Sequence, residues 1–198
     1  MKRQIQRWVE KAQSGDGWAF GKLVAHYQDK VLYLAFDMLG NWDDAKDTAQ
    51  DAFLKAYQKL PEFLGKSHFS TWLYRITVNL CMDVHRRRKR APTDLLEEST
   101  IDYAAHHPMF STAAVSPANS IETAETRQEI ERALNLLSIN QRTAIVLRYF
   151  QELSTREISE IMNCNENTVR IHFFRAMEKL KTAMDTKQKV VRKNDDLG

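Results

Sequence analysis

Apolar side chains recur every three or four residues over most of the chain, which is the spacing that one buried face of an α-helix produces. No stretch alternates apolar and polar positions over the length of a strand. In the first part of the chain the pattern predicts helices over 2–13, 18–39, 42–60 and 69–90. Gly15, Gly40 and Pro61 stand at the breaks between them, where a glycine or proline commonly ends a helix. We therefore expect an all-α protein.

The pattern changes over residues 91–126. Three prolines interrupt this segment, and serine, threonine, alanine and acidic residues dominate it. As a relaxed coil it would span about 30–35 Å on average, so we expect the parts that it joins to lie close together in the free protein. The predicted organisation is two small helical domains, over 1–90 and 127–184, joined by this flexible acidic linker and followed by a charged, frayed tail over 185–198.

Two capping boxes mark helix starts in the second domain. In a capping box, a serine oxygen accepts the backbone N–H three residues on, and a glutamine or glutamate there reaches back to the serine N–H. Ser138 with Gln141 opens a helix predicted over 139–150, and Ser154 with Glu157 opens a shorter one. The residues of the first helix that we expect to lie inside are Ile145, Val146 and Tyr149.

The shorter helix stops at residues 163–165, Asn-Cys-Asn, since asparagine tolerates a left-handed conformation better than most non-glycine residues. Asn165 can cap the next helix, which we expect over about 166–180. Two helices joined by a tight turn, the second polar and basic, are typical of a DNA-binding helix-turn-helix. An ordinary helical hairpin with a solvated basic surface is the alternative. The face beside the buried stripe of the second helix carries Asn167, Thr168, Arg170, Ile171, Phe174 and Arg175.

Charge is distributed in blocks, although the net charge of the whole chain is only +3. Residues 1–90 carry a net charge of +6, residues 91–126 of −6 and residues 127–198 of +3. Two basic blocks that flank an acidic linker suggest two modules that face anions.

The helix predicted over 69–90 combines aromatic and basic residues. Trp72 and Tyr74 lie near its start, and the five consecutive cations 86–90 end it. Aromatic rings can stack on bases while cations hold phosphates, a combination that suits single-stranded nucleic acid. In the alternative interpretation, Trp72 belongs to the core and the cations stabilise the C-terminal end of the helix.

The helix predicted over 42–60 has an alanine-rich side, including Phe53 and Tyr57, that we expect to be buried. Its opposite side is either a docking surface or a solvated face with one stray leucine, and the spacing alone favours the solvated face. That opposite side carries Asp47, Gln50, Asp51, Leu54 and Gln58.

Several classes of protein are disfavoured. The chain has no apolar run as long as a membrane span and no signal peptide, and its two distant cysteines, Cys81 and Cys164, do not make a disulfide framework. We expect reduced thiols in a cytoplasmic protein. An enzyme such as a recombinase is disfavoured, because there is no HExxH, no glycine-rich phosphate loop and no clustered carboxylate site. His85, His106 and His107 lack structural-zinc spacing, so we expect no metal and no cofactor.

Two long stretches of the sequence, taken in order along the chain, resemble the extracytoplasmic-function (ECF) group of bacterial RNA polymerase sigma factors, within the sigma-70 superfamily. The first half is similar to region two of that group, in DDAKDTAQDAFLKAYQKL and FLGKSHFSTWLYRITVNLCMDVHRRRKR. The second half is similar to region four, in LSINQRTAIVLRYFQELSTREISEIMNCNENTVRIHFFRAMEKL. Together they cover most of residues 18–182.

The resemblance implies core RNA polymerase and promoter DNA as partners, without catalysis or a small-molecule substrate. It implies docking on the clamp helices of the largest polymerase subunit by Asp47, Gln50, Asp51 and Leu54, and contact of region four with the flap of the second-largest. The residues that it implies at the separated strand of the −10 element are Lys66, His68, Trp72, Tyr74, Arg75, Asn79, Asp83, Arg86 and Arg87. At the −35 element it implies Asn167, Thr168, Arg170, Ile171, Phe174 and Arg175.

The resemblance also implies control by an anti-sigma factor, often membrane-bound, which would hold a cytoplasmic protein at the membrane. Most relatives have a glycine in the turn where this chain has Asn163. A stand-alone regulator is the alternative, in which residues 1–90 sense or dimerise and only the C-terminal half binds DNA. That regulator would bind its site alone, whereas a sigma factor needs core polymerase for strong promoter opening.

Overall fold

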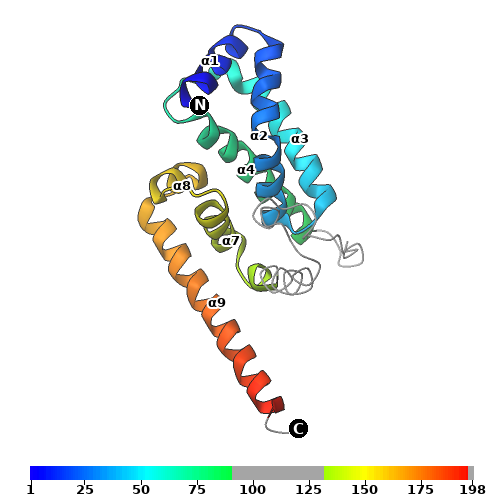
Figure 1. Cartoon of the computed structure of the whole chain (residues 1–198), viewed down its shortest axis with the longest axis vertical. Helices are drawn as coiled ribbons and strands as arrows, with labels where there is room; N and C mark the ends of the chain where they lie inside the picture. Colours follow the sequence, from blue (N-terminus) through cyan, green and yellow to red (C-terminus); the bar gives the residue numbers. More distant parts are fainter. Residues whose placement is uncertain (91–131, 196–198) are drawn as a thin grey trace.

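The computed structural model describes residues 1–90 and 132–195, with side chains described up to residue 183, and this part of the chain forms helices and turns without strands. The all-α expectation is confirmed there (Figure 1). The first domain contains α1 (Lys2–Gln13), α2 (Gly17–Leu39), α3 (Trp42–Lys59), the short 3-10 turn Leu60–Glu62 and α4 (Phe69–Arg90). The second contains α7 (Ile139–Ile145), the π-helical stretch Val146–Phe150, α8 (Thr155–Met162) and α9 (Glu166–Asp195).

Local capping explains why the helices begin and end where the sequence predicts. The Asp16 side chain accepts hydrogen bonds from the first N–H groups of α2, and Gly40, with φ of 68°, ends that helix in the left-handed conformation. The Asn41 side chain then accepts the backbone N–H of Asp44 at 2.9 Å and opens α3. Each contact satisfies backbone groups that a helix end leaves unpaired. Both predicted capping boxes, at Ser138 and Ser154, are present.

Two helices differ from the prediction. The helix that starts at Ile139 widens into a π-helix from Val146, where the N–H of Gln151 reaches back five residues to the Val146 carbonyl. The wider turn rotates the residues after it, and Tyr149 is 56% exposed instead of buried. Helix α9 continues to Asp195, past the predicted frayed start of the tail at residue 185, because the tail holds no glycine or proline before Gly198 to stop it.

The core of the first domain lies between α2, α3 and α4, where Leu23, Leu34 and Leu73 are fully buried. The small residues along the buried face of α3, such as Ala45 and Ala52, let α2 and α4 pack closely on it. An aromatic cluster closes the end of this core near the start of α4. These contacts hold α4 so that its other side faces outward.

The two domains are in direct contact. Helices α7 and α8 lie beside α4 and the C-terminal part of α2, while α9 leads away from the first domain (Figure 1). Buried residues of the second domain, including Val146, Leu147 and Ile158, belong to one hydrophobic cluster with residues of the first. The domains therefore lie as close together as the coil length of the linker predicts, and they share part of their core.

We expect Ser154→Ala to lower the free energy of unfolding by about 1 kcal/mol, because it removes the side chain that caps α8. Urea denaturation followed by circular dichroism measures the change. Ser14→Ala is the control, since the Ser14 hydroxyl only donates to carbonyls at the end of α1 and should matter less. An equal loss in both variants would contradict the capping role of Ser154.

Candidate nucleic-acid interface

The outer side of α4 carries most of the residues that the sequence places at a separated DNA strand. Arg75, Asn79, Arg86 and Arg87 are exposed along it, and Asp83 is half-buried and ion-paired with Arg86. The loop before α4 adds the exposed side chains of Lys66 and His68. Four cations among these exposed side chains suit contact with phosphates.

The half-buried ring of Trp72 lies at the edge of this basic surface. Its centroid is 4.9 Å from that of Phe63 and 5.6 Å from that of Phe69, so the aromatic cluster fixes its orientation. The ring also lines an open cleft together with Lys66 and Arg75. The structure therefore satisfies both interpretations of Trp72, as part of the core and as a ring beside cations.

Tyr74 does not belong to this surface. Its side chain is 3% exposed, and burial raises the pKa of its phenol. It lies on the same side of α4 as the buried residues Val78 and Cys81. The prediction that Tyr74 contacts the separated strand is therefore wrong for this arrangement, because the packing of α2 against α4 covers it.

The proposed docking residues on α3 are all accessible. Asp47, Gln50 and Asp51 are exposed, and Leu54 is 57% exposed. Tyr57, which the pattern placed on the buried side, is 49% exposed and lies edge-to-face on Phe20 at 4.9 Å between centroids. The sequence held a signal for this residue, since Tyr57 follows Leu54 by three positions and Gln50 by seven and so shares their side of the helix.

The helix-turn-helix prediction is confirmed in its geometry. Asn163 adopts the left-handed conformation with φ of 51° and ends α8. The Asn165 side chain accepts the backbone N–H of Thr168 at 2.7 Å and its hydroxyl at 2.9 Å, and so caps α9. Val169 and Ala176 are buried and anchor the second helix.

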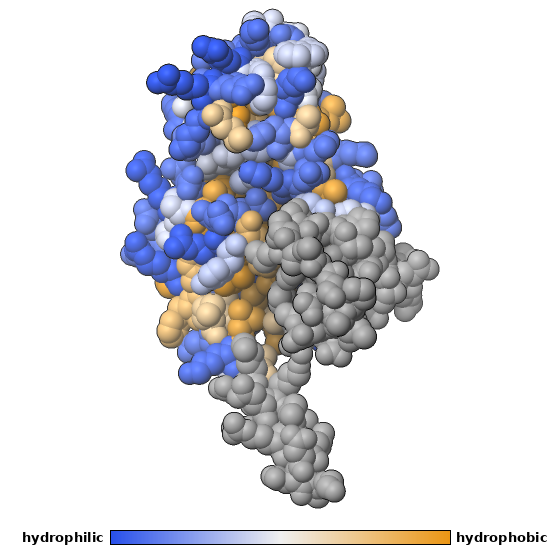
Figure 2. All heavy atoms as spheres, viewed as in Figure 1, coloured by the Kyte–Doolittle hydropathy of each residue, from blue (hydrophilic) through white to orange (hydrophobic). Residues whose placement is uncertain are grey.

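The predicted reading face of α9 is open. Asn167, Arg170, Ile171, Phe174 and Arg175 are exposed, whereas Thr168 is half-buried beside its capping bond. The Arg170 guanidinium donates to the Asn167 side chain at 2.7 Å and to Glu166 at 3.2 Å, which orients it along the helix. Phe174 is 65% exposed and Ile171 49%, and Figure 2 shows hydrophobic side chains gathered on the surface of the second domain.

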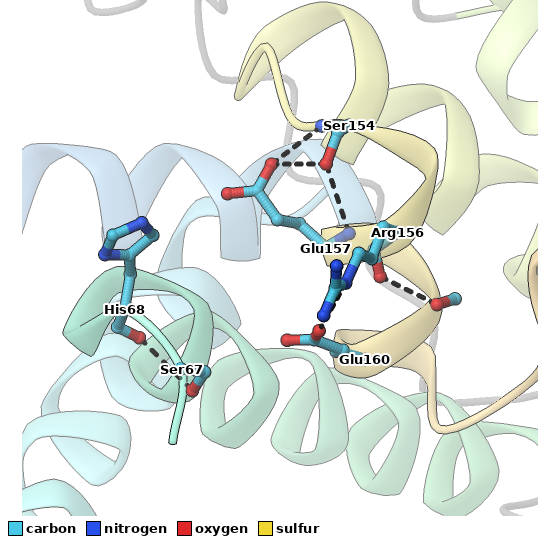
Figure 3. Close-up of polar contacts among 7 residues, drawn as sticks. Ser67, His68, Ser154, Arg156, Glu157 and Glu160 are labelled. Atoms are coloured by element: carbon cyan, nitrogen blue, oxygen red, sulfur yellow. Dashed lines mark hydrogen bonds and ion pairs between the residues drawn. The ribbon is translucent and has the colours of Figure 1, made fainter. Parts of the chain in front are cut away.

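A cleft of about 590 Å³ separates the two predicted DNA-binding surfaces. Its walls come from the start of α4 and the loop before it on one side, and from the end of α8 and the turn after it on the other. The residues that line it are Lys66, Ser67, Thr71, Trp72 and Arg75, and opposite them Ser159, Glu160, Asn163, Cys164 and Asn165. Figure 3 shows His68 on the same side of α8 as Glu157.

The described residues include no group of three or more histidine, cysteine or acidic side chains placed to hold a metal ion. His106 and His107 lie outside them. Burial raises the pKa of the Cys81 thiol to about 12 and raises that of Cys164 as well. Of the helices in the described ranges, none combines the length and the apolar character that crossing a membrane requires.

Comparison with known proteins gives two family matches, in the order that the resemblance implies. Residues 23–91 match the model of Sigma-70 region 2, and residues 127–180 match that of Sigma-70, region 4. The RNA polymerase sigma-H factor of Pseudomonas aeruginosa is 38% identical over 187 residues, covering 91% of this chain and 94% of that protein. The ECF RNA polymerase sigma factor SigW of Bacillus subtilis is 36% identical over 183 residues, covering 91% and 97%.

Solved structures show the same fold. CnrH, in complex with the cytosolic domain of CnrY, has a TM-score of 0.67 at 23% identity and covers 92% of this chain and 98% of its own. The sigma factor RpoE of Bartonella quintana, in complex with the anti-sigma factor NepR, has a TM-score of 0.64 at 25% identity, covering 84% and 96%. The chain belongs to the sigma-70 family of RNA polymerase sigma factors, in its ECF group.

Proposed function

We propose that the chain is a dissociable promoter-specificity subunit that docks on core RNA polymerase and reads the −10 and −35 elements of its promoters. The observation that carries this proposal is the separation of three exposed surfaces on three helices: an acidic and apolar one on α3, a basic one on α4 and a helix-turn-helix reading face on α9. A stand-alone regulator would need the reading face of α9 but not a basic surface for a separated strand on α4. The subunit supplies binding energy and no chemistry of its own.

At the −10 element, the basic side of α4 holds the separated strand. Lys66, Arg75, Arg86 and Arg87 contact phosphates, while the ring of Trp72 stacks on a base. Stacking of one base on an aromatic side chain contributes roughly 1–3 kcal/mol. This energy offsets the cost of taking the base out of the duplex, which is a few kcal/mol.

At the −35 element, α9 enters the major groove. Arg170 and Arg175 can pair with the acceptor atoms of guanine, and Ile171 and Phe174 can contact thymine methyl groups. Asn167 lies on the same exposed face and can pair with adenine. An open reading face on the second domain supports this assignment.

On core polymerase, α3 contacts the clamp helices of the largest subunit and the second domain contacts the flap of the second-largest. Leu54 and Tyr57 supply the apolar centre of the first contact, and Asp47 and Asp51 supply its acidic rim. An aromatic and an aliphatic side chain ringed by charge are the usual composition of an interface centre.

We also propose control by an anti-sigma factor in the cytoplasm. The solved structure of the RpoE relative contains its anti-sigma factor NepR, and the match to that RpoE covers 84% of this chain. An anti-sigma factor attached to the membrane would hold the protein at its inner surface. Release would return the subunit to core polymerase.

Binding measurements with and without core polymerase test the proposal. Free protein should bind duplex promoter DNA weakly, and addition of core polymerase should give a tight complex in which the −10 bases become reactive to permanganate. Tight, sequence-specific binding of duplex DNA by the protein alone, unchanged by core polymerase, would favour the stand-alone regulator instead.

We expect Arg170→Ala to relax the preference at one base pair of the −35 element, at a cost of about 1–3 kcal/mol in binding to the preferred sequence. The reason is that Arg170 is the exposed guanidinium nearest the start of α9, where a recognition helix meets base edges. Competition between sequence variants for the holoenzyme measures it. Lys181→Ala, farther along α9, is the control. It should either lower the affinity for all sequence variants equally or leave every affinity unchanged.

A further inference from the structure

The guanidinium of Arg170 is held by two side chains from the preceding turn of α9. Its Nη1 group donates to the Asn167 Oδ1 atom at 2.7 Å, and its Nη2 group donates to a carboxylate oxygen of Glu166 at 3.2 Å. The three side chains can meet because residues three and four apart are neighbours on the surface of a helix. Arg170 therefore has a preferred orientation before any DNA is present.

The backbone that carries these side chains is fixed by the cap of α9. The Asn165 side chain accepts the backbone N–H of Thr168 at 2.7 Å, and the Val169 side chain is fully buried. Glu166 is the first residue of the helix, where the partial positive charge of the N-terminus favours a carboxylate. Both acceptors thus start from a defined backbone, and the orientation that they give Arg170 is defined as well.

The guanidinium keeps enough donors to read a base while it is held. An arginine side chain has five N–H donors, and Asn167 and Glu166 accept one each. The Nε group and the second N–H of Nη2 lie along another edge of the guanidinium plane. Two parallel donors on one edge are what bidentate pairing with the O6 and N7 atoms of guanine requires. The holding contacts and a contact with guanine can therefore exist together.

Asn167 has two uses on the reading face, and they compete for the same oxygen. Bidentate pairing with adenine needs the side-chain oxygen to accept from N6 and the side-chain N–H to donate to N7. In the structure that oxygen already accepts from Arg170. An Asn167 side chain that turned toward adenine would release the guanidinium, so the observed arrangement favours the second use.

We propose that Asn167, together with Glu166, is a positioning residue that directs Arg170 at a base edge, and that Asn167 reads no base of its own. This inference rests on the proposed entry of α9 into the major groove at the −35 element. An exposed arginine without these acceptors can turn to a phosphate, and phosphate contacts carry no sequence information. The first turn of α9 therefore adds base discrimination to a side chain that would otherwise contribute affinity alone.

The holding contacts are not needed for the fold. The side chains of Arg170 and Glu166 are 62% and 43% exposed, and an ion pair in water contributes little to the free energy of unfolding. Asn167→Ala should therefore melt close to the wild-type temperature. Asn140→Ala is the matched control, because it removes an exposed asparagine from the same second position of α7. A change in base preference at an unchanged melting temperature then reports on recognition.

Selection from a DNA pool with a randomised −35 region, by holoenzyme that contains the full-length protein, measures the preference at each base pair. Arg170→Ala identifies the base pair that Arg170 reads. We expect Asn167→Ala to lower the preference at that same base pair about 3- to 10-fold, the range expected when a side chain must be ordered on binding. Asn140→Ala should leave every preference unchanged. An effect of Asn167→Ala at a different base pair, or at none, would overturn the positioning role.

Two further variants separate positioning from direct reading. Asn167→Asp keeps an oxygen for Arg170 but has no N–H for adenine, so the preference at the Arg170 base pair should survive while the affinity for all sequences falls through repulsion from phosphates. Asn167→Ala in the Arg170→Ala background should cause no further loss at that base pair. Loss of preference at a second base pair in Asn167→Asp, with additive effects of the two alanine substitutions, would show instead that Asn167 reads a base.

The same selection distinguishes a failure of this inference from a failure of the proposed function. A wild-type holoenzyme without any preference in the −35 region would contradict the reading of that element by α9, and the positioning role with it. A wild-type preference that Arg170→Ala relaxes and Asn167→Ala leaves intact would contradict the positioning role alone.

Discussion

Asp51→Ala combined with Leu54→Ala lowers the affinity for core RNA polymerase by about 10- to 100-fold, and this is the largest effect on assembly that we expect from surface changes. Both side chains are exposed on one side of α3, and Leu54 exposes 57% of its surface to water. The variant loses the burial of the Leu54 side chain against the clamp helices and the pairing of the Asp51 carboxylate with a polymerase cation. The loss is large because a few central residues carry most of the energy of an interface.

The affinity of labelled variants for purified core polymerase, measured by fluorescence anisotropy, tests this expectation. Glu62→Ala with Leu64→Ala is a matched control, because it removes one acid and one exposed leucine of the same domain from outside α3. We expect the control to bind core polymerase as wild type does. Equal losses in both double variants would show that α3 is not the docking helix.

Trp72→Leu reduces promoter opening by the holoenzyme about 10- to 100-fold while leaving assembly with core polymerase intact. Leucine keeps an apolar side chain against Phe63 and Phe69 but offers no ring face to a base. Loss of stacking worth roughly 1–3 kcal/mol per base accounts for the size of the effect. Permanganate reactivity of thymines in the −10 element measures opening directly.

The control for this variant is Trp8→Leu. Trp8 is half-buried on α1 and packs against the same core, and its ring centroid lies 6.4 Å from that of His26 on α2. Trp8→Leu should lower the free energy of unfolding. At a temperature where both variants are folded, it should leave promoter opening by the holoenzyme unchanged. Opening by Trp72→Leu at the wild-type level would mean that Trp72 serves the core alone.

Short-range features of this fold could be predicted from the sequence because their causes are local. The Ser154 capping box, the left-handed Asn163 and the Asn165 cap each involve residues within three or four positions of one another. Hydrogen bonds at that range form wherever the helix forms. The helix-turn-helix and the bounds of α8 follow from them.

Side chains at the border of a buried face could not be placed in this way. Tyr57 and Tyr74 both lie at such borders, and the sequence assigned the first to the core and the second to the surface, the reverse of what the structure shows. A helical period gives the centre of the buried face, but the neighbouring helices decide how wide it is. For Tyr74 the width depends on how α2 lies across α4.

The contact between the domains was even less accessible to sequence reasoning. Arg142 donates to a carbonyl 105 positions away, and a charged residue in a helix is ordinarily expected at the surface. Nothing in its neighbourhood along the chain distinguishes it from the exposed Arg148. Arg142 meets the end of α2, whereas Arg148 donates to the Leu153 carbonyl of its own domain.

Transcription from a promoter library by purified core polymerase, with and without this protein, tests the central claim most directly. The account predicts that the protein adds initiation at a subset of promoters that share one sequence near −10 and another near −35, and that core polymerase alone ignores them. No added initiation at any promoter in the library would contradict it.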